Sequence, residues 1–210
     1  MSTLASIADL VQKGKAQEVS DLVLQALDEG CGAQQILDEG LLKGMGELGV
    51  RFKNNEAFVP EVLIAARALN KGTETLKAKL VDLDVKPVGR VLIATVARDL
   101  HDIGKNLVKL MMEGTGFEVI DLGTDVPPAK IVEAVNEHNP DVVALSALLT
   151  TTMAAQGETI KALVEAGIRD KVKVIIGGAP ITESFAKEVG ADGYSEDASS
   201  AADLAKELIS

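Results

Sequence analysis

Residues 91–106 read Val-Leu-Ile-Ala-Thr-Val-Ala-Arg-Asp-Leu-His-Asp-Ile-Gly-Lys-Asn, and they decide the fold. The apolar first part predicts a buried strand, and apolar residues at helical spacing follow the polar segment. We therefore expect a strand, a loop and a helix, with Asp99, His101 and Gly104 in the first loop of an α/β unit. Such sheets bind ligands in the loops at the carboxyl ends of their parallel strands, so the residue types in this loop bear on function.

Those residue types suit a metal ligand. A neutral imidazole binds metals well, and a carboxylate two residues earlier can accept its other ring N–H, which fixes the tautomer and raises the basicity of the ring. Gly104 leaves room for a bulky group to approach the backbone. A histidine in a loop is more often a surface or capping residue, so the rest of the chain has to decide.

Composition narrows the class of protein. The 210 residues are 47% hydrophobic but only 2% aromatic, and the net charge of −11 offers no basic footprint for nucleic acid. No apolar stretch approaches the ~20 residues of a membrane span, and no signal peptide precedes the first helix, so we expect a cytoplasmic protein. Cys31 is the single cysteine, which excludes an intrachain disulfide and a thiolate cluster. We interpret His138 as a solvated loop residue, which leaves His101 as the nitrogen ligand.

The chain divides into two predicted domains, 1–86 and 87–210, joined by a short polar connection at 81–87. Amphipathic patterns in the first domain predict a helical bundle, with helices at about 3–12, 16–29, 33–52 and 60–80. Four glycines in the third of these helices indicate either close helix packing or approach to another backbone or a flat ligand.

The second domain alternates strand and helix patterns. Strands are expected at about 89–96, 117–122, 141–146, 173–177 and 192–195, and helices at about 103–115, 127–138, 153–166, 181–189 and 197–209. This alternation predicts an α/β fold with a five-stranded parallel sheet in the flavodoxin-like order 2-1-3-4-5. In that order the loops after strands one, three and four border one crevice, and they carry His101, a hydroxyl-rich segment at 146–153, and Gly177-Gly178.

The three loops together resemble a known signature. Asp99-x-His101-x-x-Gly104, Ser146-x-Leu148 and Gly177-Gly178 look like the cobalamin-binding (B12-binding) domain of methionine synthase and of corrinoid proteins in anaerobic methyltransferase systems. The helical segment before them resembles that family's cap domain. The resemblance covers essentially the whole chain.

The resemblance implies roles for individual residues. His101 would be the lower axial ligand of cobalt, Asp99 would hydrogen-bond the far side of the imidazole, and Thr152 would complete this relay. The expected cofactor-binding residues are Asp99, His101, Asp102, Ile103, Gly104, Ser146, Leu148, Thr150, Thr152, Gly177, Gly178, Ala179 and Tyr194. By domain position only, Met45, Phe52, Phe58 and Leu63 would cover the upper face of the corrin.

The sequence departs from the family pattern at two positions. Arg98 stands where the family commonly has glycine, which bears on the loop conformation and would add a cation near a phosphate or propionamide of the cofactor. Thr152 stands where methionine synthase has serine, which keeps the hydroxyl and adds a methyl group.

The function implied is that of a methyl carrier in one-carbon metabolism, with cobalt cycling between methyl-Co(III) and Co(I). The chain would be the corrinoid component of a methyltransferase complex rather than a complete enzyme. Its partners would be a donor-specific methyltransferase, an acceptor methyltransferase acting on tetrahydrofolate or a thiol, and a reductive activase. Donors in resembling systems include methylamines, methanol, betaines and aryl methyl ethers. We hypothesise that the bundle moves to admit each partner, with the 81–87 connection as hinge.

Other classes of protein fit less well. The small subunit of an adenosylcobalamin-dependent mutase resembles residues 87–210 but usually lacks the helical cap, and a non-catalytic corrinoid sensor usually carries a DNA-binding segment. A phosphoreceiver domain would have an aspartate in place of Ser146, and a flavodoxin would have aromatic rings to sandwich the flavin, where this chain offers only Tyr194.

Overall fold

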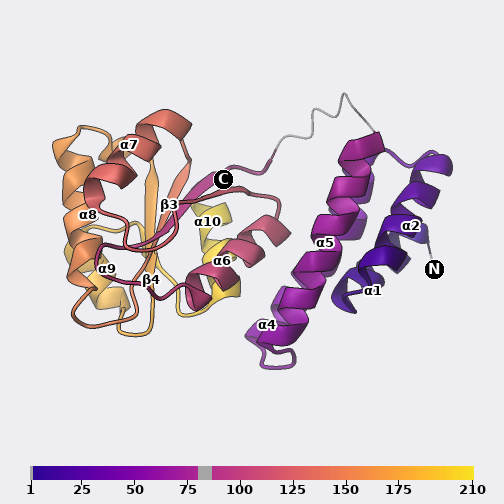
Figure 1. Ribbon diagram of the computed structural model, residues 1–210, viewed down its shortest axis with the longest axis horizontal. Coiled ribbons are helices and arrows are strands. Elements are labelled where there is room, and N and C mark those ends of the chain that lie inside the picture. The colour runs from indigo at the N-terminus through magenta and orange to yellow at the C-terminus, as the bar shows by residue number, and fades with distance from the viewer. Residues whose placement is uncertain (1, 80–86) are drawn as a thin grey trace. The chain divides into compact units, whose positions relative to one another are not determined.

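The computed structural model describes residues 2–79 and 87–210, which form two compact units (Figure 1). The N-terminal unit contains helices only, and the C-terminal unit is built on a parallel sheet. Apart from Pro87, the predicted 81–87 connection lies outside the described residues. The domain boundary and the hinge therefore stay predictions.

The N-terminal unit matches the predicted bundle, with one difference in its third helix. Its elements are α1 (Thr3–Gln12), α2 (Ala16–Asp28), α3 (Ala33–Gln35), η1 (Ile36–Leu42), α4 (Lys43–Lys53) and α5 (Val59–Lys79). The helix expected at 33–52 is one helical run, but its middle segment η1 has π-helical hydrogen bonding. Close packing explains Gly44, because a Cβ there would collide with the backbone of Ala8 in α1.

The five strands of the C-terminal unit form one sheet in which every neighbouring pair is parallel. They are β1 (Arg90–Thr95), β2 (Glu118–Asp121), β3 (Val142–Ser146), β4 (Lys173–Gly177) and β5 (Gly193–Tyr194). Their order is β2-β1-β3-β4-β5, which confirms the predicted topology. Strand β1 is buried over nearly its whole length because both faces of the sheet are covered.

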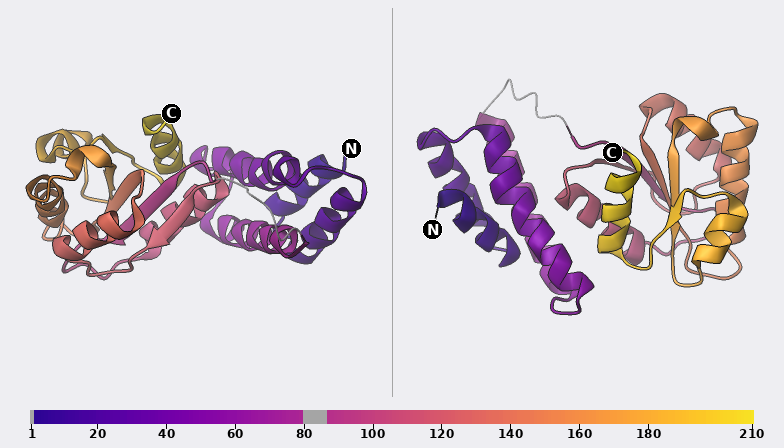
Figure 2. Two further views of the ribbon diagram at one scale, coloured as in Figure 1. Left: turned by 90° about the horizontal axis from the view of Figure 1, so that it is seen from above. Right: turned by 180° about the vertical axis from the view of Figure 1, so that it is seen from behind.

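Helices cover the sheet in two layers. In Figures 1 and 2, α7 (Pro128–His138), α8 (Ala154–Glu165) and α9 (Glu183–Val189) lie over one face, and α6 (Ile103–Gly114) and α10 (Ala198–Leu208) lie over the other. The short turn η2 (Arg169–Lys171) precedes β4. A core cluster joins the sheet to α7, α8 and α9, mainly through aliphatic side chains. His138 is the last residue of α7, so the expectation of a loop residue there was wrong.

The strand register brings the functional loops together. Thr95 at the end of β1 pairs with Ser146 at the end of β3, and Ser146 pairs with Gly177 at the end of β4. These three strands therefore end at the same level. The loops that follow them start side by side at one edge of the sheet.

Candidate functional site

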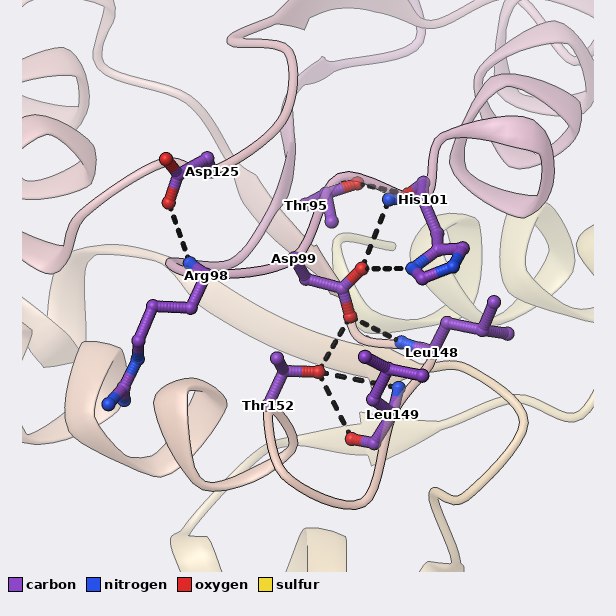
Figure 3. A network of polar contacts seen from close by, with 8 residues as sticks. All are labelled: Thr95, Arg98, Asp99, His101, Asp125, Leu148, Leu149 and Thr152. Carbon is purple, nitrogen blue, oxygen red and sulfur yellow. Dashed lines mark hydrogen bonds and ion pairs between the residues drawn. The ribbon is translucent and has the colours of Figure 1, made fainter.

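The carboxylate of Asp99 is the centre of the site. Its side chain is fully buried in the loop between β1 and α6 (Figure 3). Oδ1 accepts hydrogen bonds from the backbone N–H of His101 at 3.0 Å and from the ring Nδ1 of His101 at 2.7 Å. Oδ2 accepts from the backbone N–H of Leu148 at 2.8 Å and from Oγ1 of Thr152 at 2.6 Å. Four donors from two loops thus converge on one carboxylate.

These hydrogen bonds keep Asp99 ionised. Burial alone raises the pKa of the Asp99 carboxyl, but the hydrogen bonds from Thr152, Leu148 and His101 outweigh burial and hold that pKa well below its usual range. An ionised carboxylate has no proton to give, so Nδ1 of His101 must be the donor in the contact with Oδ1. In the neutral ring, a proton on Nδ1 leaves the lone pair on Nε2.

The imidazole is placed as a metal ligand would be. Its side chain is 49% exposed although its carboxylate partner is completely buried. A histidine whose Nδ1–H is held by a carboxylate presents a more basic Nε2 in a fixed direction. Thr95 adds a further restraint, because its buried hydroxyl donates to the backbone carbonyl of His101 at 2.9 Å.

Thr152 connects the loop after β3 to Asp99. Its hydroxyl oxygen lies 2.6 Å from Asp99 Oδ2 and 3.0 Å from the carbonyl oxygen of Leu149. A hydroxyl has one proton, and the charged, closer carboxylate is the stronger acceptor. The backbone N–H of Leu149 donates to the same hydroxyl oxygen at 3.3 Å, so Thr152 both orders its own loop and binds Asp99.

The loops that carry His101 and the Asp99 contacts also hold exposed apolar side chains. Leu100 is 73% exposed and Ile103 is 80% exposed, and Leu148 is also exposed. Beside them, a Cβ built on Gly104 would meet nothing within 4 Å. Exposed apolar side chains around a basic nitrogen fit a bulky, largely apolar ring that carries a metal.

The remaining predicted residues lie on the same sheet edge. Some have a role in the fold itself, and the others are exposed or partly buried there. Gly178 has φ +129°, and a Cβ there would collide with the carbonyl oxygen of Ala147, so the fold itself requires glycine. Tyr194 packs against the core between the sheet and α7–α9. Residues exposed in their loops or helix ends are Asp102, Thr150 and Ala179, and those partly buried are Ser146 and Gly177. Their contacts with a cofactor stay predictions.

Arg98 does not point at the imidazole. Its backbone has φ +67°, a left-handed conformation that favours glycine, which accounts for the glycine expected at this position. Its guanidinium forms a 3.4 Å ion pair with Glu158 of α8, and Figure 3 shows the side chain directed away from His101.

Two functional contacts were missed in the sequence. Lys105 is only 3% exposed, and its Nζ binds both carboxylate oxygens of Asp121 at 2.7 and 2.6 Å, which ties α6 to the end of β2. Asp125, in the loop after β2, binds the backbone beside Asp99. A lysine inside the residue 101–106 segment was a signal for the first contact, whereas the loop after β2 was not among the three that we expected to meet.

The fold and the site together define an α/β protein that presents a carboxylate-held imidazole at the carboxyl edge of a parallel sheet. Family models described as "B12 binding domain" match residues 89–203 and residues 3–77. The chain belongs to the B12-binding domain family, and a corrinoid is its cofactor. The resemblance stated from the sequence is thereby confirmed.

Individual relatives and solved structures support membership of the same family. The chain is 41% identical to dimethylamine corrinoid protein 3 of Methanosarcina acetivorans, over 98% of this chain and 96% of the relative. It is similar in structure to a chain of the methanol:cobalamin methyltransferase complex MtaBC from Methanosarcina barkeri, with a TM-score of 0.89, 31% identity, and coverage of 99% and 79%. A cobalamin-binding protein from Desulfitobacterium hafniense DCB-2 matches with a TM-score of 0.81, 34% identity, and coverage of 99% and 98%.

Across residues 2–79 and 87–210, none of the helices is long and apolar enough to cross a membrane. The cytoplasmic location stays a prediction. The cap role of the helical unit, with Met45, Phe52, Phe58 and Leu63 over the corrin, also stays a prediction.

Proposed function

We propose that this chain is a methyl carrier, and that His101 is the lower axial ligand of its corrinoid. The observation that carries the proposal is the half-exposed imidazole whose Nδ1–H is held by a buried, ionised Asp99. The similarity of nearly the whole chain to dimethylamine corrinoid proteins supports the same function. The corrinoid, when bound, supplies a cobalt centre that accepts and gives up a methyl group.

In this proposal the residues around His101 set how readily Nε2 binds and leaves the metal. Asp99 raises the basicity of the ring and keeps its free nitrogen directed outwards. The ionised Asp99 would also stabilise positive charge on the ring. The hydroxyl of Thr152 and the backbone N–H of Leu148 donate hydrogen bonds to Oδ2 of Asp99. These bonds stabilise the negative charge of the carboxylate and so weaken its attraction for the Nδ1 proton of His101.

Other residues of the sheet edge would make room for the cofactor. Gly104 offers open space next to the ligand loop, and Leu148 offers an exposed apolar surface. We propose that the lower nucleotide of the corrinoid enters beside the ends of β1, β3 and β4. The residues proposed to line this slot are Asp102, Ile103, Gly104, Ser146, Leu148, Thr150, Gly177, Gly178, Ala179 and Tyr194.

The proposed partners are two methyltransferases and a reductive activase. One methyltransferase would load the methyl group and the other would pass it to tetrahydrofolate or a thiol. One relative named above is a dimethylamine corrinoid protein, and a further relative from Methanosarcina acetivorans, 39% identical, is trimethylamine corrinoid protein 1. These names favour a methylated amine as the donor, and methanol, named in the MtaBC structure, is the alternative.

Electron paramagnetic resonance of the protein reconstituted with a corrinoid tests the proposal. In the Co(II) state, we expect nitrogen splitting from an imidazole in the wild type, loss of that splitting in His101→Ala, and no change in His138→Ala. The chain has only these two histidines, so the pair of variants is decisive. A protein that binds no corrinoid, or a His101→Ala variant with an unchanged spectrum, would contradict the proposal.

The donor is tested separately. The protein is reconstituted with a corrinoid, and the cobalt is reduced. It is then mixed with a dimethylamine-, a trimethylamine- or a methanol-specific methyltransferase and its substrate, and methylation of the corrinoid is followed by the visible spectrum. We expect the fastest methylation with an amine-specific enzyme. Faster methylation with the methanol enzyme would assign the chain to the alternative donor.

A further inference from the structure

Asp125 binds the ligand loop from a loop that carries no expected site residue. It lies between β2 and α7, and its Oδ1 accepts a hydrogen bond from the backbone N–H of Arg98 at 2.6 Å (Figure 3). Its own backbone N–H donates to the carbonyl oxygen of Asp99 at 2.9 Å. The two bonds bracket the α-carbon of Asp99. They restrain the backbone on both sides of the residue that holds the imidazole.

Both partners of this contact have left-handed backbones. Arg98 has φ +67° and Asp125 has φ +53°. This conformation is unfavourable for an ordinary L-residue, although aspartate tolerates it better because its short side chain can hydrogen-bond locally. The neighbouring residues Val96 and Val126 form a parallel bridge, so the loop after β2 runs along the ligand loop.

We propose that Asp125 is a positioning residue for the imidazole of His101, acting through Asp99. The structure puts the chain of contacts in order: Asp125 fixes the Arg98–Asp99 backbone, and Asp99 fixes Nδ1–H. The inference rests on the proposed function, in which His101 is the ligand. Its first test needs no corrinoid, because the tautomer of the imidazole is a property of the protein alone.

Three variants separate the hydrogen bonds of Asp125 from its other properties. Asp125→Gly removes the carboxylate and tolerates the positive φ. Asp125→Asn keeps an acceptor oxygen and also tolerates this backbone conformation, so it folds under the same restraints. Asp141→Gly is the matched control, because Asp141 makes the same pair of bonds to one residue, Arg90, at the opposite end of β1: its Oδ2 accepts from Arg90 N at 2.7 Å, and its N donates to Arg90 O at 2.8 Å.

The measurement is ¹⁵N NMR of the histidine rings in the full-length protein without corrinoid, at a pH where both rings are neutral. His138 serves as an internal reference. We expect His101 to be nearly all Nδ1–H tautomer in the wild type, in Asp125→Asn and in Asp141→Gly. In Asp125→Gly we expect its Nε2–H share to rise severalfold, while the ratio at His138 stays constant.

Several results would overturn the inference. One is an unchanged tautomer ratio in Asp125→Gly, and another is an equal shift in Asp141→Gly, which would indicate general loosening. A shift in Asp125→Asn as large as in Asp125→Gly would also overturn it, because charge and not the hydrogen bond would then be responsible.

Loading the same variants with a corrinoid separates this inference from the proposed function. Nitrogen splitting in the Co(II) spectrum should weaken in Asp125→Gly and remain in Asp141→Gly. If the wild type itself shows no splitting, the proposed function fails, and the tautomer result still decides whether Asp125 positions His101.

Discussion

At the scale of single residues, the most informative one is Arg98, because its backbone adopts a left-handed conformation that favours glycine. Its left-handed backbone costs about 1–2 kcal/mol relative to glycine. Its 3.4 Å ion pair with Glu158 lies at the surface and offsets little of that cost. The hydrogen bond from the Arg98 N–H to Oδ1 of Asp125 helps to stabilise this left-handed backbone conformation next to the site.

Replacing Arg98 should reveal this strain. Arg98→Gly and Arg98→Ala both lose the ion pair, but only glycine relieves the backbone. We expect Arg98→Gly to have a free energy of unfolding about 1 kcal/mol higher than Arg98→Ala, measured by urea denaturation. Glycine also gains entropy in the unfolded chain, which keeps the difference near the low end of the range. Equal stability of the two variants would show that the conformation at residue 98 is not strained.

The ionisation of Asp99 predicts a dependence of stability on pH. Its folded-state pKa is depressed, so it contributes stability that is present above the unfolded pKa of about 4 and is lost as pH falls towards the folded pKa. Asp99→Asn removes this contribution and points an amide N–H₂ at groups that are themselves donors. At pH 7 we expect a loss of about 2–3 kcal/mol, and we expect the difference from wild type to narrow below pH ~4.

Thermal and urea unfolding across this pH range check that prediction. Asp125→Asn serves as the control, because Asp125 is exposed and its amide retains the acceptor oxygen. A gap between wild type and Asp99→Asn that stays constant from pH 7 to pH 3 would contradict the assignment of an ionised Asp99.

The Asp99, His101 and Thr152 contacts were expected because the resemblance to the cobalamin-binding family implied them, and the structure has both hydrogen bonds to Asp99. The contact of Asp125 was not. It depends on two left-handed residues in different loops, and hydrophobic periodicity carries no information about such backbone conformations. The same holds for the direction of the Arg98 side chain.

At the scale of elements, β1, β3 and β4 were predictable because each is a short apolar run, and both faces of a parallel sheet are buried. The order of the strands followed from right-handed crossovers. The π-helical segment η1 was not predictable, because it differs from an α-helix in which carbonyl each N–H reaches, and not in the pattern of apolar residues.

The attachment of α6 to the sheet gives a prediction at this scale. Lys105 and Asp121 form an ion pair in which the lysine side chain is 2% exposed and the aspartate 20%. Lys105→Met leaves Lys109, at the longer distance of 3.6 Å, as the cation beside Asp121, together with the backbone N–H of Gly123 at 2.9 Å, so we expect a loss of about 2–3 kcal/mol in the free energy of unfolding. The double variant Lys105→Met/Asp121→Asn should recover part of this loss, since the unpaired charge is gone.

Denaturation of the single and double variants is the measurement. Lys187, an exposed partner of Glu183 in α9, provides the control, and Lys187→Met should change stability by less than about 0.5 kcal/mol. If the double variant is no more stable than Lys105→Met, the loss comes from packing and not from the unpaired charge.

At the scale of the whole molecule, the chain is two units, and B12-binding family models match residues 3–77 and residues 89–203. The net charge of −11 does not favour nucleic acid as a partner, and it says nothing of which methyltransferase docks. Partner choice depends on surface shape and charge placement, which no motif in the sequence encodes.

The hydrogen bonds to Asp99 also bear on how this site tolerates inherited change. Two of its four donors are backbone N–H groups, those of His101 and Leu148, and they persist whatever side chains those positions carry. A mutation at residue 152 therefore removes one donor and leaves most of the anion's support intact. A single substitution at residue 152 can therefore change the hydrogen bonding of Asp99, while the Asp99–His101 contact is retained.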